Sequence, residues 1–306
     1  MSSENRFDGL QEFAETVRTG SFTAAASKLG VTASAVGKSV SRLEARLGTK
    51  LLHRSTRSLS LTSEGEVFHT TCMHILEELE SAEGTLSVGT SVPVGRVRVD
   101  LPGAFGRRHV MPVLLDLTLR HPRLDLSVMF SERTVDIFAE ATDLAVRIGE
   151  LRQDVGLAAR RLGTQRLVIC AAPIYLSEHG TPRAPAELSQ RDCVVGWRSE
   201  ARATWLLKRE DGPVFTQEAR TRHEFSDGDA MLSAVLGGAG LSQLPTWLVS
   251  EHIASGALVP VLTEYAGAEM PIHAVWPQSR YMKPKLRVII DALAEAASSK
   301  ISGFHP

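Results

Sequence analysis

Apolar residues in the first sixty positions recur at helical spacing in three short runs. The first run consists of Phe7, Leu10, Phe13, Ala14 and Val17. Gly20 ends this helix, and Ser21 is the expected N-cap of a second helix that continues to Leu29. After Gly30, Thr32 is the expected N-cap of a third helix, whose buried stripe is Val36, Val40, Leu43 and Leu47. Two helices joined by a glycine turn, with alanines where they approach, are typical of a helix-turn-helix.

A wing and a long helix are predicted next. Leu59 to Thr62 alternates between apolar and polar residues, which favours a small β-hairpin with two arginines at its tip. The segment 63–90 then carries an apolar seam without a gap, made of Phe68, Cys72, Ile75, Leu79, Ala82 and Leu86. Ser63 and Glu66 match a capping box at its start. We expect this helix to pair with its copy in a second chain; the alternative is that it packs on its own domain.

The pattern changes after a linker at 89–95. Strands are expected at 97–101, 124–130 and 144–148. Helices are expected up to about Arg120, at 134–141 and beyond Pro284. Alternating strands and helices favour an α/β fold with crossover helices.

Charge separates the first part of the chain into two blocks. Residues 28–61 hold seven Lys and Arg side chains and one Glu, whereas residues 63–90 hold six Glu and no Lys or Arg. A basic block within a chain of net charge −1 indicates a module that binds a polyanion. No apolar run is long enough to cross a bilayer, and the N-terminus lacks the features of a secretory signal, so we expect a cytoplasmic protein with no membrane partner.

The sequence does not match the catalytic and cofactor-binding motifs that parts of it superficially resemble. Residues 32–39 lack the first glycine of a phosphate-binding loop, and 237–240 follow a helix rather than a strand. His69 and His74 are spaced wrongly for one metal, and we expect neither a metal nor a cofactor. The three cysteines lie far apart, so buried thiols are expected, with a redox pair of Cys170 and Cys193 as the alternative. No catalytic group stands out, which argues against an enzyme.

The third predicted helix has a polar face that suits a major groove. Ser34, Lys38 and Ser41 lie opposite the apolar stripe, and Arg42 lies on its flank. Lys38, Arg54 and Arg57 are expected to meet phosphates, and Arg42 is the candidate for a base contact. The full set of expected DNA contacts is Thr23, Thr32, Ser34, Lys38, Ser39, Arg42, Arg54, Thr56 and Arg57.

These residues carry a family resemblance. Residues 22–65 closely resemble the N-terminal domain of LysR-type transcriptional regulators. The resemblance rests on Phe22-Thr23-Ala24-Ala25-Ala26, Arg42-Leu43-Glu44, Leu47-Gly48, Leu61-Thr62 and Gly65. The segments 143–149 and 238–245 look like the effector-binding domain of that family. The resemblance therefore covers essentially the whole chain.

The resemblance implies an α/β protein with three parts: a winged helix-turn-helix at 1–62, a dimerising linker helix at 63–90, and an effector-binding domain at 91–306 shaped like a two-lobed periplasmic binding protein. Lobe I is expected at about 93–163 and 269–306, and lobe II at about 164–268. The hinge would lie near Gly163-Thr164 and Glu269-Met270.

Two departures from the family pattern are visible. Ala33 and Gly37 stand where the recognition helix often has Gln and Ser, so base contacts would depend more on its other polar residues. In the effector domain, Pro102-Gly103-Ala104 stands where the family commonly has a hydroxyl, although the backbone N–H groups of 103–105 remain available to an anion. Asp227 and Asp229 argue against a strongly anionic ligand.

An effector is expected between the lobes, at strand ends and helix starts. The candidate lining residues are Pro102, Gly103, Ala104, Phe105, Phe130, Ser131, Arg147, Ile148, Trp197, Phe225, Ser226 and Pro245. Arg147 has a structural ion pair as its alternative, and Phe130 and Phe225 have the core. A small organic acid or an aromatic compound is what the family implies.

The expected function is sequence-specific regulation of transcription, with double-stranded DNA, a small-molecule effector and a second copy of the chain as partners, in a dimer or tetramer. RNA polymerase is a further candidate partner. Two rival classes are a solute-binding protein and an enzyme with an accessory DNA-binding module.

Overall fold

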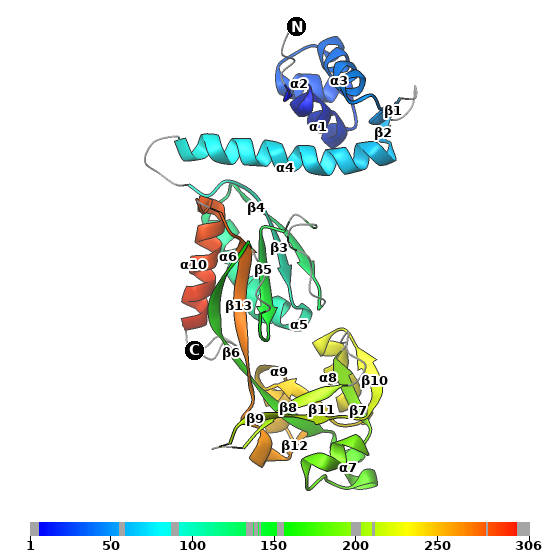
Figure 1. Ribbon diagram of the computed structural model, residues 1–306, viewed down its shortest axis with the longest axis vertical. Coiled ribbons are helices and arrows are strands. Elements are labelled where there is room, and N and C mark those ends of the chain that lie inside the picture. The colour runs from blue at the N-terminus through cyan, green and yellow to red at the C-terminus, as the bar shows by residue number, and fades with distance from the viewer. Residues whose placement is uncertain are drawn as a thin grey trace. The chain divides into compact units, whose positions relative to one another are not determined.

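The computed structural model describes residues 6–54, 59–86, 92–132, 137, 140, 142–151, 156–196, 203–209, 212–279 and 281–298 (Figure 1). The chain divides into two compact units, Met1–Ser91 and Val92–Pro306, and each is described by itself. In the described residues, no helix is both long and apolar enough to cross a membrane.

Unit 1 is a winged helix-turn-helix followed by a long helix. Its elements are α1 (Leu10–Thr19), α2 (Phe22–Leu29), α3 (Ala33–Leu47), β1 (Leu52–Arg54), β2 (Leu59–Leu61) and α4 (Ser63–Leu86). The predicted N-caps are confirmed: Ser21 Oγ accepts the N–H of Thr23 at 3.2 Å, and Thr32 Oγ1 accepts the N–H of Ala35 at 3.2 Å. Gly30 ends α2 at φ 68°, in the left-handed region that glycine enters without strain.

The core of unit 1 lies between the three short helices. Phe13, Val36, Val40 and Leu43 are fully or almost fully buried. Leu47 was also expected in this stripe, but it is 40% exposed, because α3 ends there and the stripe is covered only as far as Leu43.

The start of α4 differs by one residue from the prediction. The helix begins at Ser63, so the capping residue is Thr62 rather than Ser63. Thr62 Oγ1 accepts the N–H of Gly65 at 2.9 Å and donates to the carbonyl of Lys50 at 2.7 Å. Thr62 is therefore held by Lys50, in the connection between α3 and β1, and a local capping pattern does not contain this contact twelve residues back in the chain.

The apolar seam of α4 is divided between two environments. Cys72 is 1% exposed and donates through Sγ to the carbonyl of Leu10 at 3.4 Å, and Phe68 and Ile75 pack against the same core. Leu79, one turn further on, is 48% exposed. For the first half of the seam the alternative interpretation is therefore correct: it packs on its own domain.

Unit 2 is a mixed α/β domain. Its strands are β3 (Gly95–Leu101), β4 (Leu124–Phe130), β5 (Leu144–Ile148), β6 (Leu157–Ala171), β7 (Cys193–Gly196), β8 (Thr204–Lys208), β9 (Val214–Glu218), β10 (Thr221–Phe225), β11 (Ser242–Pro245), β12 (Val259–Val261) and β13 (Glu269–Pro277). Its helices are α5 (Gly103–Phe105), the π-helix η1 (Gly106–Val110), α6 (Met111–Arg120), α7 (Pro173–His179), the 3₁₀ helix η2 (Pro185–Ser189), α8 (Gly228–Leu236), α9 (Thr246–Ala254), the 3₁₀ helix η3 (Thr263–Tyr265) and α10 (Pro284–Ser298). The helix expected at 134–141 falls mostly outside the described residues.

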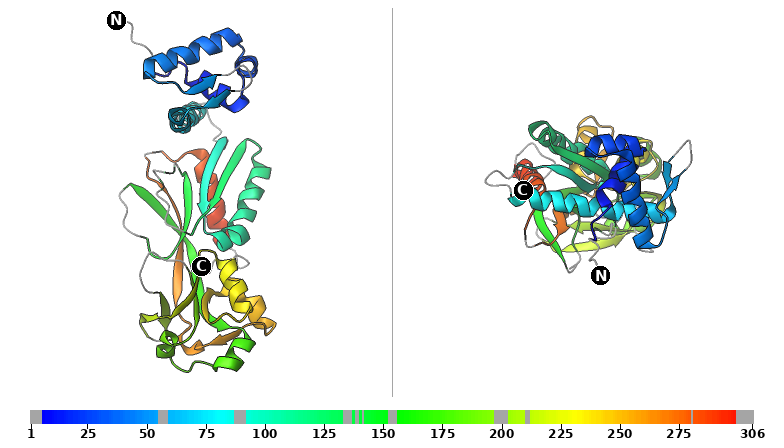
Figure 2. Two further views of the ribbon diagram at one scale, coloured as in Figure 1. Left: turned by 90° about the vertical axis from the view of Figure 1, so that its right-hand side faces the viewer. Right: turned by 90° about the horizontal axis from the view of Figure 1, so that it is seen from above.

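One seven-stranded sheet connects two halves of unit 2. Its order is β11-β6-β13-β5-β3-β4, with β12 also paired to β6. β3 runs parallel to β4 and β5, whereas β13 runs antiparallel to β5 and β6. The first part of β6 pairs with β13 and its last part with β11 and β12, so the long strands β6 and β13 pass from one half to the other, as the two views show (Figures 1 and 2).

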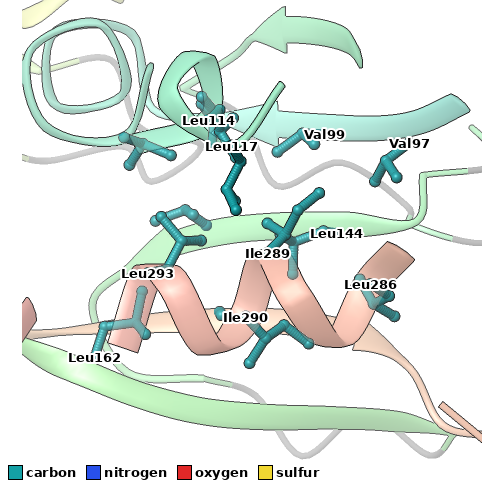
Figure 3. Packing of buried hydrophobic residues seen from close by; sticks show 14 of the residues in the cluster. Val97, Val99, Leu114, Leu117, Leu144, Leu162, Leu286, Ile289, Ile290 and Leu293 are labelled. Carbon is teal, nitrogen blue, oxygen red and sulfur yellow. The ribbon is translucent and has the colours of Figure 1, made fainter. Parts of the chain in front are cut away.

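Each half of unit 2 has its own core. In the first half, α10 lays Leu286, Ile289, Ile290 and Leu293 against the sheet and α6 (Figure 3). In the second half, α8 and α9 cover the end of β6. Because the halves share strands but not cores, a cleft between them is the natural place for a ligand.

Candidate functional site

The exposed face of α3 is short, polar and basic. Ser34, Lys38 and Arg42 are exposed, and they line a shallow hollow together with Ala35, Gly37, Ser41 and Ala45. Among the described residues, neither Lys38 nor Arg42 forms an ion pair with an acid. The two cations are therefore available to a polyanion.

Other expected DNA contacts fall in different places. Thr23 is exposed on α2, and exposed Thr32 caps α3. Ser39 is 6% exposed and belongs to the buried side of α3, so its expected DNA contact does not fit this geometry. Arg54 ends β1, but its side chain lies outside the described residues, as do Thr56 and Arg57 altogether.

Glu44 connects α3 to the wing. It is 2% exposed, and its Oε1 accepts the N–H groups of Leu51 and Leu52 at 3.0 and 3.2 Å. Its Oε2 receives Lys50 Nζ at 3.0 Å. A buried carboxylate with these partners fixes the strand that opens the wing relative to the recognition helix. In the sequence, Glu44 stands out only as the one acid in the basic block.

A cavity of about 400 Å³ lies between the halves of unit 2. Seven of the expected effector residues line it: Pro102, Ala104, Phe105, Ile148, Phe225, Ser226 and Pro245. Lining residues that the sequence analysis missed include Glu132, Gln165, Trp205, Met231, Gln243, Trp247 and Met270. Met270 belongs to the predicted hinge and Gln165 follows it directly, which is the one signal that pointed to these two residues.

Four of the remaining expected effector residues make other contacts within the protein. Arg147 donates to Asp100 at 2.6 Å, and the two side chains are 15% and 3% exposed, so the structural alternative is correct for Arg147. The N–H of Gly103 donates to Glu132 Oε1 at 2.7 Å and is therefore not open to an anion. Phe130, 43% exposed, has the Arg107 guanidinium 5.6 Å from its ring centre. Ser131 bonds through its N–H to the carbonyl of Leu101 outside the cavity lining, and Trp197 lies outside the described residues.

Ion pairs and rings join the two halves beside the cavity. Arg107 donates to Asp227 at 2.7 Å and to Asp229 at 2.8 Å, and Arg108 donates to Asp229 at 2.7 Å. Asp227 also caps α8 by accepting the N–H groups of residues 229 and 230. The arginines come from η1 and the aspartates from the start of α8, so these contacts bridge the two halves of unit 2.

The Trp247 ring packs across the cleft. It lies edge-on to Phe105 and His109 at ring-centre distances of 5.6 and 4.9 Å, and its Nε1–H donates to Gln165 at 3.0 Å. Burial lowers the pKa of His109 below its ordinary value, and the charge of Arg108 lowers it further. A neutral imidazole is therefore held in this contact.

The cysteines are buried free thiols. Burial raises the pKa of Cys72 to about 11 and those of Cys170 and Cys193 to about 12. A thiol with such a pKa carries almost no thiolate at neutral pH, which disfavours the redox alternative. Within the described residues, no group of three or more metal-ligating side chains comes together.

A helix-turn-helix with an exposed basic face on one unit and a cavity between the two halves of the other are typical of a ligand-responsive DNA-binding protein. Comparison with known proteins specifies the class. Residues 7–66 match the family model "Bacterial regulatory helix-turn-helix protein, lysR family", and residues 90–298 match "LysR substrate binding domain". The chain belongs to the LysR family of transcriptional regulators.

Similar proteins cover nearly the whole chain. The transcriptional regulator CrgA of Neisseria meningitidis serogroup C is 34% identical over 96% of this chain and 98% of its own, and DmlR of Escherichia coli is 34% identical over 96% and 95%. The solved structure of CrgA from Neisseria meningitidis superposes with a TM-score of 0.60 at 32% identity, covering 97% of this chain and 100% of that one. The full-length structure of the virulence activator AphB of Vibrio cholerae superposes with a TM-score of 0.60 at 27% sequence identity, covering 94% of this chain and 98% of that one.

The relatives decide between the classes that the sequence left open. They are transcriptional regulators, so the protein binds DNA through its helix-turn-helix and an effector through its substrate-binding domain; it is not an enzyme. The predicted fold and family are thereby confirmed.

Proposed function

We propose that α3 enters the major groove, with Ser34, Lys38 and Arg42 facing the DNA. The observation that carries this proposal is the two-sided character of α3: Val36, Val40 and Leu43 are buried on one side, and the free cations lie on the other. Lys38 meets phosphate, and Arg42 reaches a base edge. The wing, braced by Glu44, extends the contact with Arg54, Thr56 and Arg57.

Two α3 helices act together in a dimer or tetramer. Leu79 and Val67 leave apolar surface on α4, 48% and 73% exposed, and a second copy of α4 would cover it. Paired recognition helices then occupy successive major grooves about 34–36 Å apart. RNA polymerase is a further partner of the DNA-bound assembly. We assign 1–62 to the DNA-binding domain, 63–90 to the linker helix, and the rest to lobe I (93–163, 269–306) and lobe II (164–268).

The effector occupies the cavity of about 400 Å³ between the lobes, and its binding changes how the assembly holds DNA. The volume falls in the range of small-molecule sites. A ligand regulates only if it binds one arrangement of the protein better than another, and a cavity formed by two lobes meets this condition whenever the lobes move.

The test is DNA binding by the full chain, measured by fluorescence anisotropy on a selected operator and on random duplex. Arg42→Ala should reduce the preference for the operator by about 1–3 kcal/mol. Lys38→Ala should weaken both duplexes alike and lower the salt slope by about 1. Arg120→Ala, on α6 of unit 2, is the matched control. Equal losses on the two duplexes for Arg42→Ala would remove its base contact.

A further inference from the structure

The wall of the cleft is acidic at the point where the lobes approach. Of the described residues that line the cavity, the charged ones are Glu132 and Asp227, one from each lobe. Both converge on Gly103, where an added Cβ would lie 3.1 Å from Glu132 Oε1 and 2.6 Å from Asp227 Oδ2. Two carboxylates therefore face the same small space, with Nη1 of Arg107 at 3.4 Å from the same position, and only a glycine leaves this space open.

The backbone donor at this point is already in use. The N–H of Gly103 donates to Glu132 Oε1 at 2.7 Å. Pro102, the residue before it, has no N–H to offer. An anionic ligand would have to displace Glu132 from this donor and then lie beside the charge of Asp227. The protein's own carboxylate thus occupies the position that an anionic effector would need.

The amide and indole groups of the wall, on Gln165, Gln243 and Trp247, make contacts within the protein. Gln243 donates to the carbonyl of Leu206 at 2.6 Å and accepts its N–H at 3.1 Å. Gln165 accepts the indole N–H of Trp247 at 3.0 Å, and its Nε2 has only a long contact of 3.9 Å with the sulfur of Met270. Among the described residues of the lining, the charged groups are thus the two carboxylates, and both are acceptors.

The nearby arginines do not cancel this charge. Arg107 and Arg108 together pair with Asp227 and Asp229 and lie outside the cavity lining. Counting Glu132, three carboxylates face two guanidinium groups among the described residues, so this cluster carries one more negative charge than positive charge. Desolvation raises the pKa of Glu132, and the charge of Asp227 raises it further, whereas the N–H of Gly103 and the charge of Arg107 act in the opposite direction.

Apart from the hydroxyl groups of Thr204 and Ser226, the side chains of the remaining wall are apolar. Phe105, Trp205, Phe225, Met231 and Met270 contribute aromatic rings and thioethers. Such a surface takes the hydrocarbon or aromatic body of a ligand, and thioethers adapt to its shape.

We propose that the effector is a small, mainly apolar compound with a protonated amine, whose ammonium group lies between Glu132 and Asp227. This inference rests on the proposed function of the cleft as the effector site, and it departs from the organic acid that the family resemblance implied. The ammonium supplies both the missing counter-charge and the missing donors, and its body lies against the aromatic wall.

The test uses three probes of the same size and ring: phenethylamine, 2-phenylethanol and phenylacetate. Isothermal titration of the full chain at neutral pH should rank them in that order, with the amine bound at least about tenfold more tightly than the acid. Glu132→Gln should weaken amine binding about tenfold and change alcohol binding less than about twofold. Glu178→Gln, an exposed position on α7 outside the lining, is the matched control and should change neither.

Three results would overturn the ligand class: phenylacetate binding as tightly as phenethylamine, no measurable amine binding, or unchanged amine binding in Glu132→Gln. Thr204→Trp, which fills the cavity from its wall, separates this failure from failure of the site. If it abolishes binding of a preferred phenylacetate, the site stands and the class is wrong; if binding persists, the cleft is not the effector site. Quenching of Trp205 and Trp247 by the probes reports on the same question without a cavity-filling variant.

Discussion

Glu44 offers the sharpest test of how the DNA-binding unit is held together. Glu44→Ala removes the acceptor for two backbone N–H groups, those of Leu51 and Leu52, at residues that are 1% and 3% exposed. Water cannot replace the carboxylate without opening the junction between α3 and β1. Glu44→Gln keeps an amide oxygen for the same donors and loses only the charge.

The magnitude follows from these contacts. Leaving a buried donor unsatisfied costs about 1–3 kcal/mol, so the two donors together should cost about 2–6 kcal/mol in Glu44→Ala. The pair with Lys50 is worth far less, since the lysine side chain is 73% exposed and such pairs contribute about 0–1 kcal/mol. Glu44→Gln should therefore cost about 1 kcal/mol or less.

The assay is amide hydrogen exchange at Leu51 and Leu52 in the full chain. Each 1.4 kcal/mol lost lowers protection about tenfold, so Glu44→Ala should lose about 30-fold or more and Glu44→Gln less than about tenfold. Operator binding should fall in the same order, because the wing loses its fixed position. Equal losses in the two variants would show that the charge, and not the backbone acceptor, holds the wing, and would refute this reasoning.

Three further predictions concern packing and protonation. Leu114→Ala, at a fully buried position, should lower the free energy of unfolding of unit 2 by about 2–5 kcal/mol. Leu119→Ala, at an 81% exposed position on the same helix, should change this free energy little. Urea titration followed by tryptophan fluorescence measures unit 2 alone, because all four Trp lie in it. Gly65→Ala should destabilise unit 1, because its Cβ would overlap the backbone carbonyl oxygen of Leu51, just before the wing. Gly37→Ala places its Cβ where nothing lies within 4 Å, so it should be neutral or stabilise unit 1 by up to about 1 kcal/mol. Melting curves followed by circular dichroism compare the two variants. Burial holds the pKa of His109 below 6.5, so the unfolded chain takes up the proton first as the pH falls. The stability of unit 2 should therefore fall as the pH drops below about 6.5. His109→Phe should flatten this pH dependence, and an unchanged slope in the variant would contradict the prediction.

Local patterns predicted local structure well. The N-caps at Ser21 and Thr32 depend on contacts within three residues, so the sequence contains all the information that they need. The capping residue of α4 was placed one position late, because Thr62 is held by Lys50, twelve residues back. The seam of α4 shows the same limit: its period predicts an apolar stripe, but not that Cys72 packs on α1.

The cleft was harder to predict because its chemistry is made by residues far apart in the chain. Glu132 acts on Gly103, Arg107 on Asp227, and Trp247 on Gln165. Each of these pairs joins different elements, and the Arg107–Asp227 pair joins the two lobes. Arg147 had two open interpretations until the neighbouring strand placed Asp100 beside it.

The link between ligand and lobe arrangement follows from a shared carboxylate. Asp227 lines the cavity and also holds Arg107 from the other lobe at 2.7 Å. An ammonium group that took Asp227 would therefore compete with an interlobe ion pair whose side chains are 42% and 35% exposed. A pair so exposed contributes about 0–1 kcal/mol, so a ligand of modest affinity is enough to displace it. Because β6 and β13 keep the lobes connected through continuous strands, loss of that pair would leave bending of these strands as the way for the lobes to respond.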